Sequence, residues 1–467
     1  MSEEMRKKRV AVIGGGLVGA LNACYFSRRK YKVDVYEMRS DIRKAEVVRG
    51  RSINLALSVR GREALKMVEM EEEVINRGIR MYSRMIHDRD GTLRVIPYGR
   101  KDQYIMSVDR RHLNEVLLTA AEKNPDITLH FEHKLVNSDF NTGEIVFKRS
   151  DGTIVKDVVD AIIGCDGAFS AVRNQIMKNT LFNYQQEYIP HGYMELNMPP
   201  TASDEFAMAI NHLHIWARNE YMMIALPNQD KSFTLTLFMP FKIFDSIKTE
   251  DDLMNFFHKN FQDSIPLIGE EELKQMYFRS KALPLISIKC SPYHTGDKAL
   301  IMGDAAHAIV PFYGQGMNCG FEDCLVLNDL LDKHRDDIGA AFEEYTKVRT
   351  VDAQAICDLS MYNYIEMRKS VNSRLFLLRK KVDSFLTWLF PRTWIPLYTM
   401  VAFTRTRYHE CILKRQWQDK VITYFLLAFG GTCCVSAGLG IWQIYQGNLT
   451  LPDRLLHLAK PFQRYWS

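Results

Sequence analysis

The residues nearest the start of the chain that could carry chemistry are three glycines and one acid. Gly14, Gly16 and Gly19 form a GxGxxG pattern. The first glycine of such a pattern permits a tight turn, the second lets the backbone approach a pyrophosphate, and the third lets a helix pack on a strand. Glu37 follows at a distance where a carboxylate can accept hydrogen bonds from a ribose hydroxyl. The pattern predicts a dinucleotide site at a helix N-terminus, whose N–H groups and dipole favour phosphate.

Two Asp-containing motifs further along indicate which dinucleotide binds. Asp166 lies in the segment CDGA after one apolar run, and Asp304 lies in GDAAH after another. Both motifs resemble those of flavoprotein hydroxylases with a single Rossmann domain, which implies that Asp304 binds the ribityl chain of FAD. A nicotinamide dinucleotide has no such chain. His307, in the same segment, is expected to be a structural histidine rather than a base.

A glycine-rich segment completes the predicted flavin site. Gly314–Asn318 reads GQGMN and opens a predicted helix, so that backbone N–H groups near Gly316 could lie beside N1 and O2 of the flavin. The positive end of the helix dipole would there favour the negative charge of reduced flavin.

The elements that must position these motifs follow from the apolar runs. Arg9–Ile13 is predicted as a buried strand, a helix extends from the glycines to Arg28, and Lys32–Glu37 is predicted as a second strand. Asp160–Cys165 is a further strand, and a helical pattern dominates after Gly316. This order fits a dinucleotide-binding unit.

Length and composition exclude several classes of protein. A chain of 467 residues is too long for one hydrophobic core. Its net charge is 61 − 56 = +5, without a basic stripe interleaved with aromatics, so we expect no nucleic-acid partner. Its nine cysteines are scattered and form no CxxC pair, which predicts neither a disulfide framework nor a metal site. The segment 1–8 has no apolar core of the kind that a cleaved secretory signal requires.

A long apolar segment near the C-terminus predicts a membrane anchor. Val421–Tyr445 carries no charge over 25 residues, which as a helix is enough to cross a hydrocarbon core of about 30 Å. Lys414, Arg415 and Lys420 precede it, so the large N-terminal part is expected on the cytosolic side. A buried core helix and a helix lying on the membrane are the alternatives. The tail Leu449–Ser467 mixes apolar and basic residues and could contribute.

Taken together, these motifs resemble the kynurenine 3-monooxygenase family of FAD-dependent aromatic hydroxylases. The extreme N-terminus and the C-terminal tail match poorly, whereas the rest matches continuously. The matching segments include VAVIGGGLVGA (Val10–Ala20), RGRSINLALS (Arg49–Ser58), IPHGYMEL (Ile189–Leu196), GDAAHAIVPFYGQGMN (Gly303–Asn318), DLSMYNYIEMR (Asp358–Arg368) and IPLYTMVAFTR (Ile395–Arg405).

The resemblance implies an activity and a location. It implies NADPH- and O₂-dependent hydroxylation of L-kynurenine to 3-hydroxykynurenine through a C4a-hydroperoxyflavin, in tryptophan degradation, on the outer mitochondrial membrane with the catalytic part facing the cytosol. The flavin carries the hard chemistry, so no catalytic side chain is predicted. A related monooxygenase acting on another aromatic, and a tethered flavoprotein that has lost catalysis, are the alternatives. The intact Asp304 and GQGMN segment argue against the second.

The same resemblance implies the residues of the two sites. The substrate carboxylate would be held by Arg84, Tyr98, Asn363 and Tyr398, and its ring would be enclosed by Leu213, Ile224, Phe238 and Phe312. Together with the motifs, it predicts flavin contacts at Gly14, Gly16, Val18, Gly19, Glu37, Arg39, Ala56, Arg110, Leu135, Asp166, Asp304, Gly316, Met317 and Asn318.

The hairpin predicted at Arg84–Tyr98 gives partial independent support. A three-residue loop at Asp90–Thr92 would pair Arg84 with Tyr98, whereas a two-residue loop would pair it with Pro97. A guanidinium suits a carboxylate because its fork donates two parallel hydrogen bonds. Without the resemblance, Arg84 would be interpreted as a solvated surface arginine.

The predicted fold class is therefore α/β, with a Rossmann-type FAD-binding domain, an inserted and mostly antiparallel β-sheet domain for the substrate, and a C-terminal helical membrane-anchoring region. We expect the FAD-binding domain at 1–180 and 285–345, including a substrate-site hairpin near 82–100, the substrate domain at 181–284, a helical region at 346–420, the anchor at 421–445 and a tail at 446–467.

Overall fold

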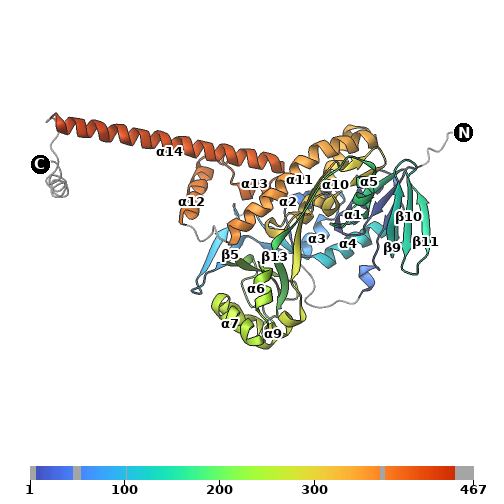
Figure 1. Cartoon of the computed structure of the whole chain (residues 1–467), viewed down its shortest axis with the longest axis horizontal. Helices are drawn as coiled ribbons and strands as arrows, with labels where there is room; N and C mark the ends of the chain where they lie inside the picture. Colours follow the sequence, from blue (N-terminus) through green and yellow to red (C-terminus); the bar gives the residue numbers. More distant parts are fainter. Residues whose placement is uncertain (1–6, 46–53, 101, 369–373, 447–467) are drawn as a thin grey trace. The chain divides into compact units, whose positions relative to one another are not determined.

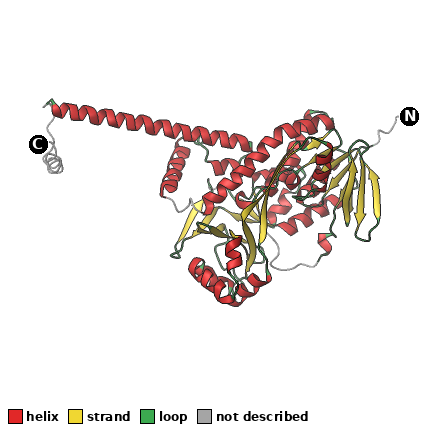
Figure 2. Ribbon diagram, in the orientation of Figure 1, coloured by secondary structure: helices red, strands yellow, loops and turns green. Residues whose placement is uncertain are grey.

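The computed structural model of the chain describes residues 7–45, 54–100, 102–368 and 374–446. The chain forms two compact units, Met1–His409 and Glu410–Ser467. The strands that the structure describes lie in the first unit and form four sheets, shown as yellow arrows in Figure 2. The predicted α/β class is confirmed.

A six-stranded sheet forms the dinucleotide-binding part. Its strands lie in the order β18 (His294–Thr295), β19 (Ala299–Ile301), β12 (Ala161–Gly164), β1 (Arg9–Ile13), β2 (Lys32–Tyr36) and β8 (Ile127–His130). All neighbours are parallel except β18 and β19. The central strand β1 is buried on both faces, as expected of a parallel sheet covered by helices. The predicted strands at Arg9–Ile13 and Lys32–Glu37 are confirmed to within one residue.

Helices α1 (Leu17–Arg28), α4 (Arg110–Glu122) and α10 (Gly316–Lys333) accompany this sheet (Figure 1). Helix α1 packs against both of the others. Buried apolar side chains from these helices and the sheet form the largest hydrophobic core, with Val12, Leu21 and Phe321 fully or almost fully buried. This core holds the glycine turn between β1 and α1 in place.

A seven-stranded sheet forms the second large layer. Its order is β17 (Leu283–Ser291), β13 (Asn183–Met198), β16 (Phe233–Pro240), β15 (Tyr221–Pro227), β14 (His212–Arg218), β5 (Ser83–His87) and β6 (Leu93–Pro97). Only β14 and β5 pair in parallel.

Alternate residues of this sheet serve two different cores. One face packs on α6 (Phe241–Ser246), α7 (Glu250–Asn260), α8 (Ile265–Ile268) and α9 (Glu270–Arg279), with Trp216 and Phe233 fully buried there. Helices α6, α7 and α9 appear together beside β13 in Figure 1. The other face carries Ile215 and Phe238 and meets later segments of the chain. A strand alternates its side chains between faces, so one sheet can support a structural core and a binding surface.

The predicted hairpin exists, but its predicted register is wrong. Arg84 pairs with Ile96, not with Tyr98 or Pro97, and the N–H of Tyr98 donates to the carbonyl of Tyr82. The last pair is His87 with Leu93, which leaves a five-residue loop. The carboxylate of Asp90 accepts the N–H of Thr92 at 3.0 Å and tightens this loop. Arg84 and Tyr98 are therefore diagonal neighbours rather than a direct pair.

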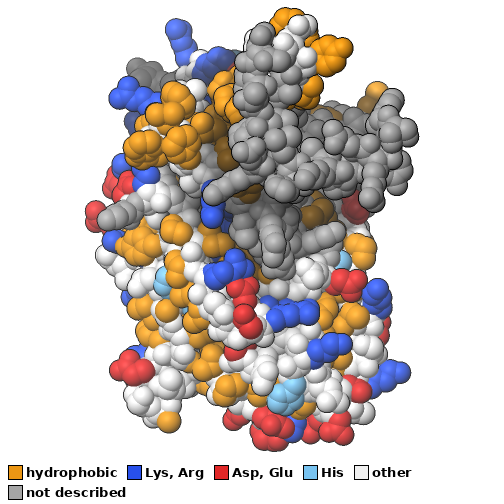
Figure 3. All heavy atoms as spheres, turned by 90° about the vertical axis from the view of Figure 1, so that its left-hand side faces the viewer, with side chains coloured by type: hydrophobic (Ala, Val, Ile, Leu, Met, Phe, Trp, Pro, Cys, Tyr) orange, Lys and Arg blue, Asp and Glu red, His pale blue; other side chains and the backbone are white. Residues whose placement is uncertain are grey.

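The remaining elements complete the first unit. Two three-stranded sheets contain β3 (Asn54–Leu57), β7 (Ile105–Asp109) and β4 (Ile79–Met81), and β11 (Ile154–Val158), β10 (Glu144–Arg149) and β9 (His133–Asp139). The other helices are α2 (Val59–Met67), α3 (Glu71–Asn76), α5 (Ala171–Asn179), α11 (Ile338–Arg368), α12 (Arg374–Leu389) and α13 (Leu397–Phe403), with short 3-10 turns η1 (Ile42–Lys44), η2 (Gln262–Ser264), η3 (Gly303–Ala305) and η4 (Pro311–Tyr313). On the face shown in Figure 3, basic and acidic side chains are interspersed in the lower part.

Helix α14 (Tyr408–Tyr445) contains the predicted anchor. It is long and apolar enough to cross a membrane, and none of its apolar stretch is buried. Phe425, Leu427 and Ile441 each expose more than half of their surface. A core helix would be covered, so exposure agrees with the predicted membrane anchor rather than with a buried helix. The tail Leu449–Ser467 lies outside the described residues.

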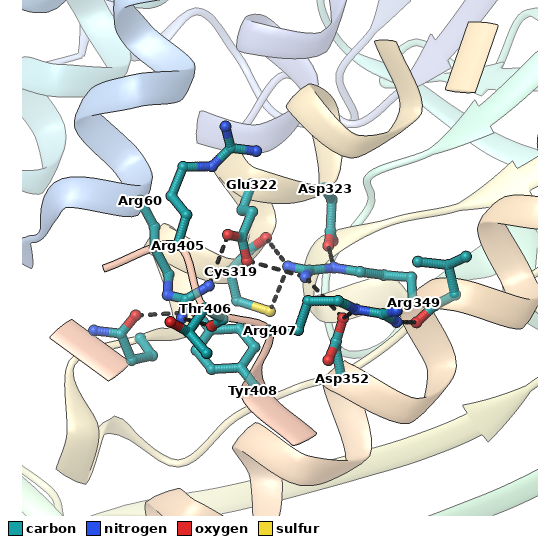
Figure 4. A network of polar contacts seen from close by, with 12 residues as sticks. Arg60, Cys319, Glu322, Asp323, Arg349, Asp352, Arg405, Thr406, Arg407 and Tyr408 are labelled. Atoms are coloured by element: carbon teal, nitrogen blue, oxygen red, sulfur yellow. Dashed lines mark hydrogen bonds and ion pairs between the residues drawn. The ribbon is translucent and has the colours of Figure 1, made fainter. Parts of the chain in front are cut away.

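Buried ion pairs tie several helices of the first unit together (Figure 4). Arg60 of α2 and Arg349 of α11 share the carboxylate of Glu322 on α10, at 2.7 and 3.0 Å. Asp352 of α11 bonds to Arg407 at 2.9 Å and to the ring of His409 at 2.7 Å. Removing one member of a buried pair leaves an uncompensated charge, so these contacts constrain how the helices pack.

We predict that Asp352→Asn lowers the free energy of unfolding at neutral pH by about 2 kcal/mol, because Asp352 is buried but its partners are partly exposed. Burial raises the pKa of Asp352, but His409, Arg349 and Arg407 outweigh this and hold it below its usual value. Its contribution is therefore complete above an unfolded pKa of about 4 and is lost as pH falls below it. Urea titrations should show that the free energies of unfolding of the variant and the wild type differ less at about pH 3.5 than at neutral pH.

The control is Asp358→Asn. Asp358 pairs with Lys289 but exposes 66% of its side chain. Its loss should cost less than about 0.5 kcal/mol at every pH. A pH-independent deficit for Asp352→Asn would contradict the assignment of a charged, stabilising carboxylate.

Candidate functional site

The turn between β1 and α1 requires two of its three glycines for space. Gly14 has φ +103°, and a Cβ there would lie 2.5 Å from the carbonyl oxygen of Cys165. A Cβ on Gly19 would lie 1.9 Å from the carbonyl oxygen of Gly14. A Cβ on Gly16 would meet nothing within 4 Å. Gly16 is the N-cap of α1, so open space lies before the positive end of this helix, as a pyrophosphate requires.

Glu37 is held beside this turn. Its carboxylate accepts the N–H of Gly15 at 2.8 Å and the N–H of Arg39 at 2.9 Å. The acid predicted to bind a ribose thus lies at the end of β2 against the glycine turn. Val18 of α1 lies close to the GDAAH segment, because a Cβ on Gly303 would lie 3.1 Å from the side chain of Val18.

Asp304 is exposed, although the residues on either side of it are buried. It follows β19 in the turn η3, and its side chain is exposed. No hydrogen bond to its carboxylate is found within the described residues. Desolvation by the surrounding protein raises its pKa, while Arg110, at the start of α4, lowers it. An accessible carboxylate without a protein donor is available to the hydroxyls of a ligand.

The GQGMN segment begins α10 as predicted. A Cβ on Gly316 would meet nothing within 4 Å, whereas a Cβ on Gly314 would lie 3.0 Å from the Cβ of Ala56. Asn318 is fully buried, donates to the carbonyls of Ala56 and Gly314 at 2.8 and 2.7 Å, and accepts the N–H of Ser58. Its amide therefore joins the end of β3 to the loop before α10. Met317 beside it is half-buried.

Two predicted flavin contacts are engaged elsewhere. The carboxylate of Asp166 accepts the hydroxyl of Ser170 at 2.5 Å and the N–H of Ala171 at 2.6 Å, and so caps the start of α5. Leu135 is 5% exposed and packs in the largest core. The side chains of Asp166 and Leu135 are therefore engaged within the protein, and their contacts with the flavin stay predictions.

The residues present fit FAD. Open space lies before the N-termini of α1 and α10, next to Gly16 and Gly316. An accessible carboxylate, Asp304, follows the strand β19 in the same sheet as β1. These features would serve a pyrophosphate, a flavin ring and a ribityl chain respectively.

A buried guanidinium marks the second part of the site. Arg84 of β5 is 5% exposed, and its Cζ lies 4.1 Å from the ring centre of Tyr398 and 5.9 Å from that of Tyr98. Burial works against its charge, but Tyr398, Tyr98 and Glu366 outweigh this and raise its pKa. Neither the Nε of Arg84 nor the hydroxyl of Tyr98 has a hydrogen-bond partner among the described residues. Buried donors of this kind are costly unless a ligand satisfies them.

Apolar side chains lie on the same face of the sheet as Arg84. Phe238 and Phe312 lie 5.1 Å apart, in a cluster that also contacts Leu213 and Ile224. Leu213 is the parallel partner of Arg84 across β14 and β5. An adjoining cluster contains Tyr398, Tyr98, Leu213, Ile224 and Ala56. Residues predicted to contact the substrate thus lie close to one predicted to contact the flavin.

Asn363 of α11 was predicted to hold the substrate carboxylate, but both N–H groups of its amide are used within the protein. It is buried, and its Nδ2 donates to the carbonyl of Phe312 at 2.7 Å and to the sulfur of Met367 at 3.2 Å. The carbonyl of Phe312 can only accept, so the amide nitrogen must face it. Both N–H groups are thus engaged, and Asn363 offers its oxygen, an acceptor, to a ligand.

Sequence reasoning missed the aromatic stack that supports Arg84. Tyr398 stacks on Tyr98 at 5.7 Å and on Tyr313 at 5.4 Å, and Tyr364 stacks on Phe312 at 3.8 Å. Tyr313 directly precedes GQGMN, and Tyr364 directly follows Asn363. Both therefore lay within the family-like segments, but no local pattern marks a residue that stacks on a distant one.

His307 is a structural histidine, in agreement with the prediction. It is 1% exposed and bonds to Asp323 at 2.7 Å, which raises its pKa although burial opposes this. His307, Cys319 and Asp323 bring ligand-type atoms within 4.8 Å of one another. Asp323 already bonds to Arg349 and to the N–H of Gly303, so the cluster is explained as an ion-pair network.

Comparison with known proteins places this geometry in a family. The model of the FAD binding domain matches residues 7–360. The chain is 54% identical to a kynurenine 3-monooxygenase of Sus scrofa, over 93% of this chain and 92% of that protein. It is 53% identical to a kynurenine 3-monooxygenase of Anopheles gambiae, over 92% of this chain and 89% of that protein.

A solved structure of 2-methyl-3-hydroxypyridine-5-carboxylic acid oxygenase has a similar fold, with a TM-score of 0.65 at 17% identity over 80% of this chain and 95% of that one. This likeness concerns the fold alone. The FAD binding domain and the similarity to its relatives over almost the whole chain show that the chain belongs to the kynurenine 3-monooxygenase family of FAD-dependent monooxygenases.

Proposed function

We propose that this protein hydroxylates L-kynurenine to 3-hydroxykynurenine, with FAD as cofactor and NADPH and O₂ as cosubstrates. The names of its relatives support this substrate. The observation that carries the proposal is Arg84, a buried cation with an unsatisfied N–H, set among aromatic and apolar side chains. An aromatic amino acid has the carboxylate and the ring that such a site can take.

The contacts suggest how the substrate lies. Its carboxylate would accept two parallel hydrogen bonds from the fork of Arg84 and one from the hydroxyl of Tyr98. The oxygen of Asn363 would accept from its ammonium group. Its ring would lie among Leu213, Ile224, Phe238 and Phe312.

The protein's contribution to the reaction is orientation and exclusion of water. FAD, when bound, supplies the redox chemistry through which NADPH and O₂ hydroxylate the ring. The apolar wall around Phe238 and Phe312 keeps bulk solvent from the reacting ring. The amine on kynurenine's own ring activates the adjacent carbon, so the site needs no strong base, in accord with the structural role of His307.

The location that we propose is the outer mitochondrial membrane, with the first unit on the cytosolic side. The exposed apolar length of α14 supports a membrane location. Lys414, Arg415 and Lys420 precede the apolar stretch and support the orientation.

The proposed reaction predicts a defined product. Detergent-solubilised protein with FAD, NADPH and kynurenine should form 3-hydroxykynurenine, identified by mass spectrometry, with kynurenine-stimulated NADPH oxidation. Hydroxybenzoates serve as the comparison, because a related monooxygenase for another aromatic would prefer one of them. NADPH oxidation stimulated only by a hydroxybenzoate would refute kynurenine as the substrate.

Arg84→Ala should raise KM for kynurenine at least about tenfold, because a hydrogen-bonded charge on the carboxylate is lost. The purified variant should remain yellow, since Arg84 contacts the substrate side. Steady-state kinetics and flavin absorbance check this. The control is Arg94→Ala on the same hairpin, where Arg94 pairs with the partly exposed Asp88. An unchanged KM in Arg84→Ala would remove Arg84 from the carboxylate site.

Deletion of 421–467 should move the protein from the membrane pellet to the soluble fraction, because the apolar stretch of α14 is removed. Deletion of 447–467 alone is the control and should leave the protein in the pellet. Fractionation followed by immunoblotting measures both. Pelleting of the longer deletion after high-salt and carbonate washes would mean that another surface binds the membrane.

A further inference from the structure

The helix that carries Tyr398 is poorly anchored by its own sequence. Helix α13 is seven residues long, and its N-cap, Pro396, makes no side-chain capping bond. A helix of this length is marginal in isolation. Yet Tyr398 must hold its ring 4.1 Å from the guanidinium of Arg84. Contacts at the other end of α13 must therefore fix its position.

One side chain supplies those contacts. Arg60 of α2 donates from Nε to the carbonyl of Val401 at 2.9 Å and from Nη2 to the carbonyl of Thr406. Val401 lies near the end of α13, and Thr406 lies in the segment that follows. Helices leave their last carbonyls without partners, and a guanidinium is suited to satisfy two at once.

Arg60 is itself fixed from the opposite side. Its Nη1 bonds to Glu322 of α10 at 2.7 Å, and its Cζ lies 3.9 Å from the ring centre of Tyr408. Figure 4 shows Arg60 between Glu322 on one side and Thr406 and Tyr408 on the other. The hydroxyl of Tyr408 donates to Gln315 at 3.0 Å, and Gln315 is the N-cap of α10 within GQGMN. Arg60 thus connects α13 to the helix that faces the flavin.

We propose that Arg60 is a positioning residue for substrate recognition, which acts through α13 to hold Tyr398 over Arg84. The inference rests on the proposed function, because it assumes that Arg84 receives the substrate carboxylate. Arg60 is 1% exposed and belongs to α2, whereas Arg84 belongs to β5 and lies over the ring of Tyr398. We expect the main effect of Arg60 on the geometry of the carboxylate site.

The test compares two substrates, kynurenine and its decarboxylated analogue, in wild type and in Arg60→Lys. A lysine keeps the charge toward Glu322 but cannot donate to two carbonyls in the fork geometry. The preference for kynurenine, taken as the ratio of the two kcat/KM values, should fall about tenfold, the loss expected for one weakened hydrogen bond to a charged group. FAD content and turnover of the analogue should stay within about twofold of wild type.

The matched control is Arg218→Lys. Arg218 is also buried, at 3% exposure, and also donates to backbone carbonyls, those of Asn260, His87 and Ala217. It lies on the face of the large sheet that packs on the helical layer, opposite Arg84. A general loss of stability from replacing a buried arginine should appear in both variants, whereas loss of preference should appear only in Arg60→Lys.

A second variant covers the case in which Arg60→Lys does not fold. The hydroxyl of Thr404 donates to the carbonyl of Met400 at 2.6 Å and accepts the N–H of Thr406 at 3.1 Å. Thr404→Val loosens the same end of α13 without touching a buried charge. It should lower the preference for kynurenine in the same selective way.

The possible outcomes distinguish a failure of the proposed role of Arg60 from a failure of the proposed carboxylate site at Arg84. Wild type without any preference for kynurenine over its decarboxylated analogue would overturn the proposed carboxylate site. Wild type with that preference, retained by Arg60→Lys, would overturn the role of Arg60 alone. Where Arg60→Lys does not fold, a preference retained by Thr404→Val would overturn it. An equal fall for both substrates would make Arg60 merely structural.

Discussion

Burial of cationic charge is the constraint on which the rest of this structure depends. Arg60, Arg84 and Arg349 are each at most 5% exposed. A buried cation must be matched by acceptors, because an unmatched one is strongly destabilising. Arg60 and Arg349 find carboxylates and carbonyls within the protein. Arg84 instead lies over the ring of Tyr398, and its Nε has no hydrogen-bond partner within the described residues. The same physical demand that fixes helices elsewhere thus creates a candidate binding site here.

A few hydrogen bonds to the backbone connect the predicted flavin site with the predicted substrate site. Ala56 of β3 lies against Gly314, and Asn318 donates to the carbonyls of both. Two residues later, Ser58 donates its N–H to the same amide and leads into α2. The chain that touches the predicted flavin face therefore continues directly into the helix that carries Arg60. The segment from Ala56 to Arg60 therefore contacts both the loop before α10 and the helix α13.

Much of the architecture was predictable because it is encoded locally. The apolar run before GxGxxG predicted β1 and α1, and the uncharged stretch 421–445 predicted the long C-terminal helix. The predicted hairpin register was wrong because the register depends on the hydrogen bond that the N–H of Thr92 donates to the carboxylate of Asp90, which residue types alone do not specify. The stack of Tyr98, Tyr313 and Tyr398 was invisible for another reason: its members come from three distant segments.

The two Asp motifs show why similar local sequences take different roles. Asp166 follows β12 and turns back onto the first N–H groups of α5, so its carboxylate is consumed in starting a helix. Asp304 follows β19, the next strand in the sheet, but enters a short 3-10 turn that gives its carboxylate no N–H groups to cap. What distinguishes them is the element that comes next. The carboxylate of Asp304, which accepts no hydrogen bond within the described residues, is the one available to a ligand. Burial raises its pKa, and the positive charge of Arg110 opposes this rise.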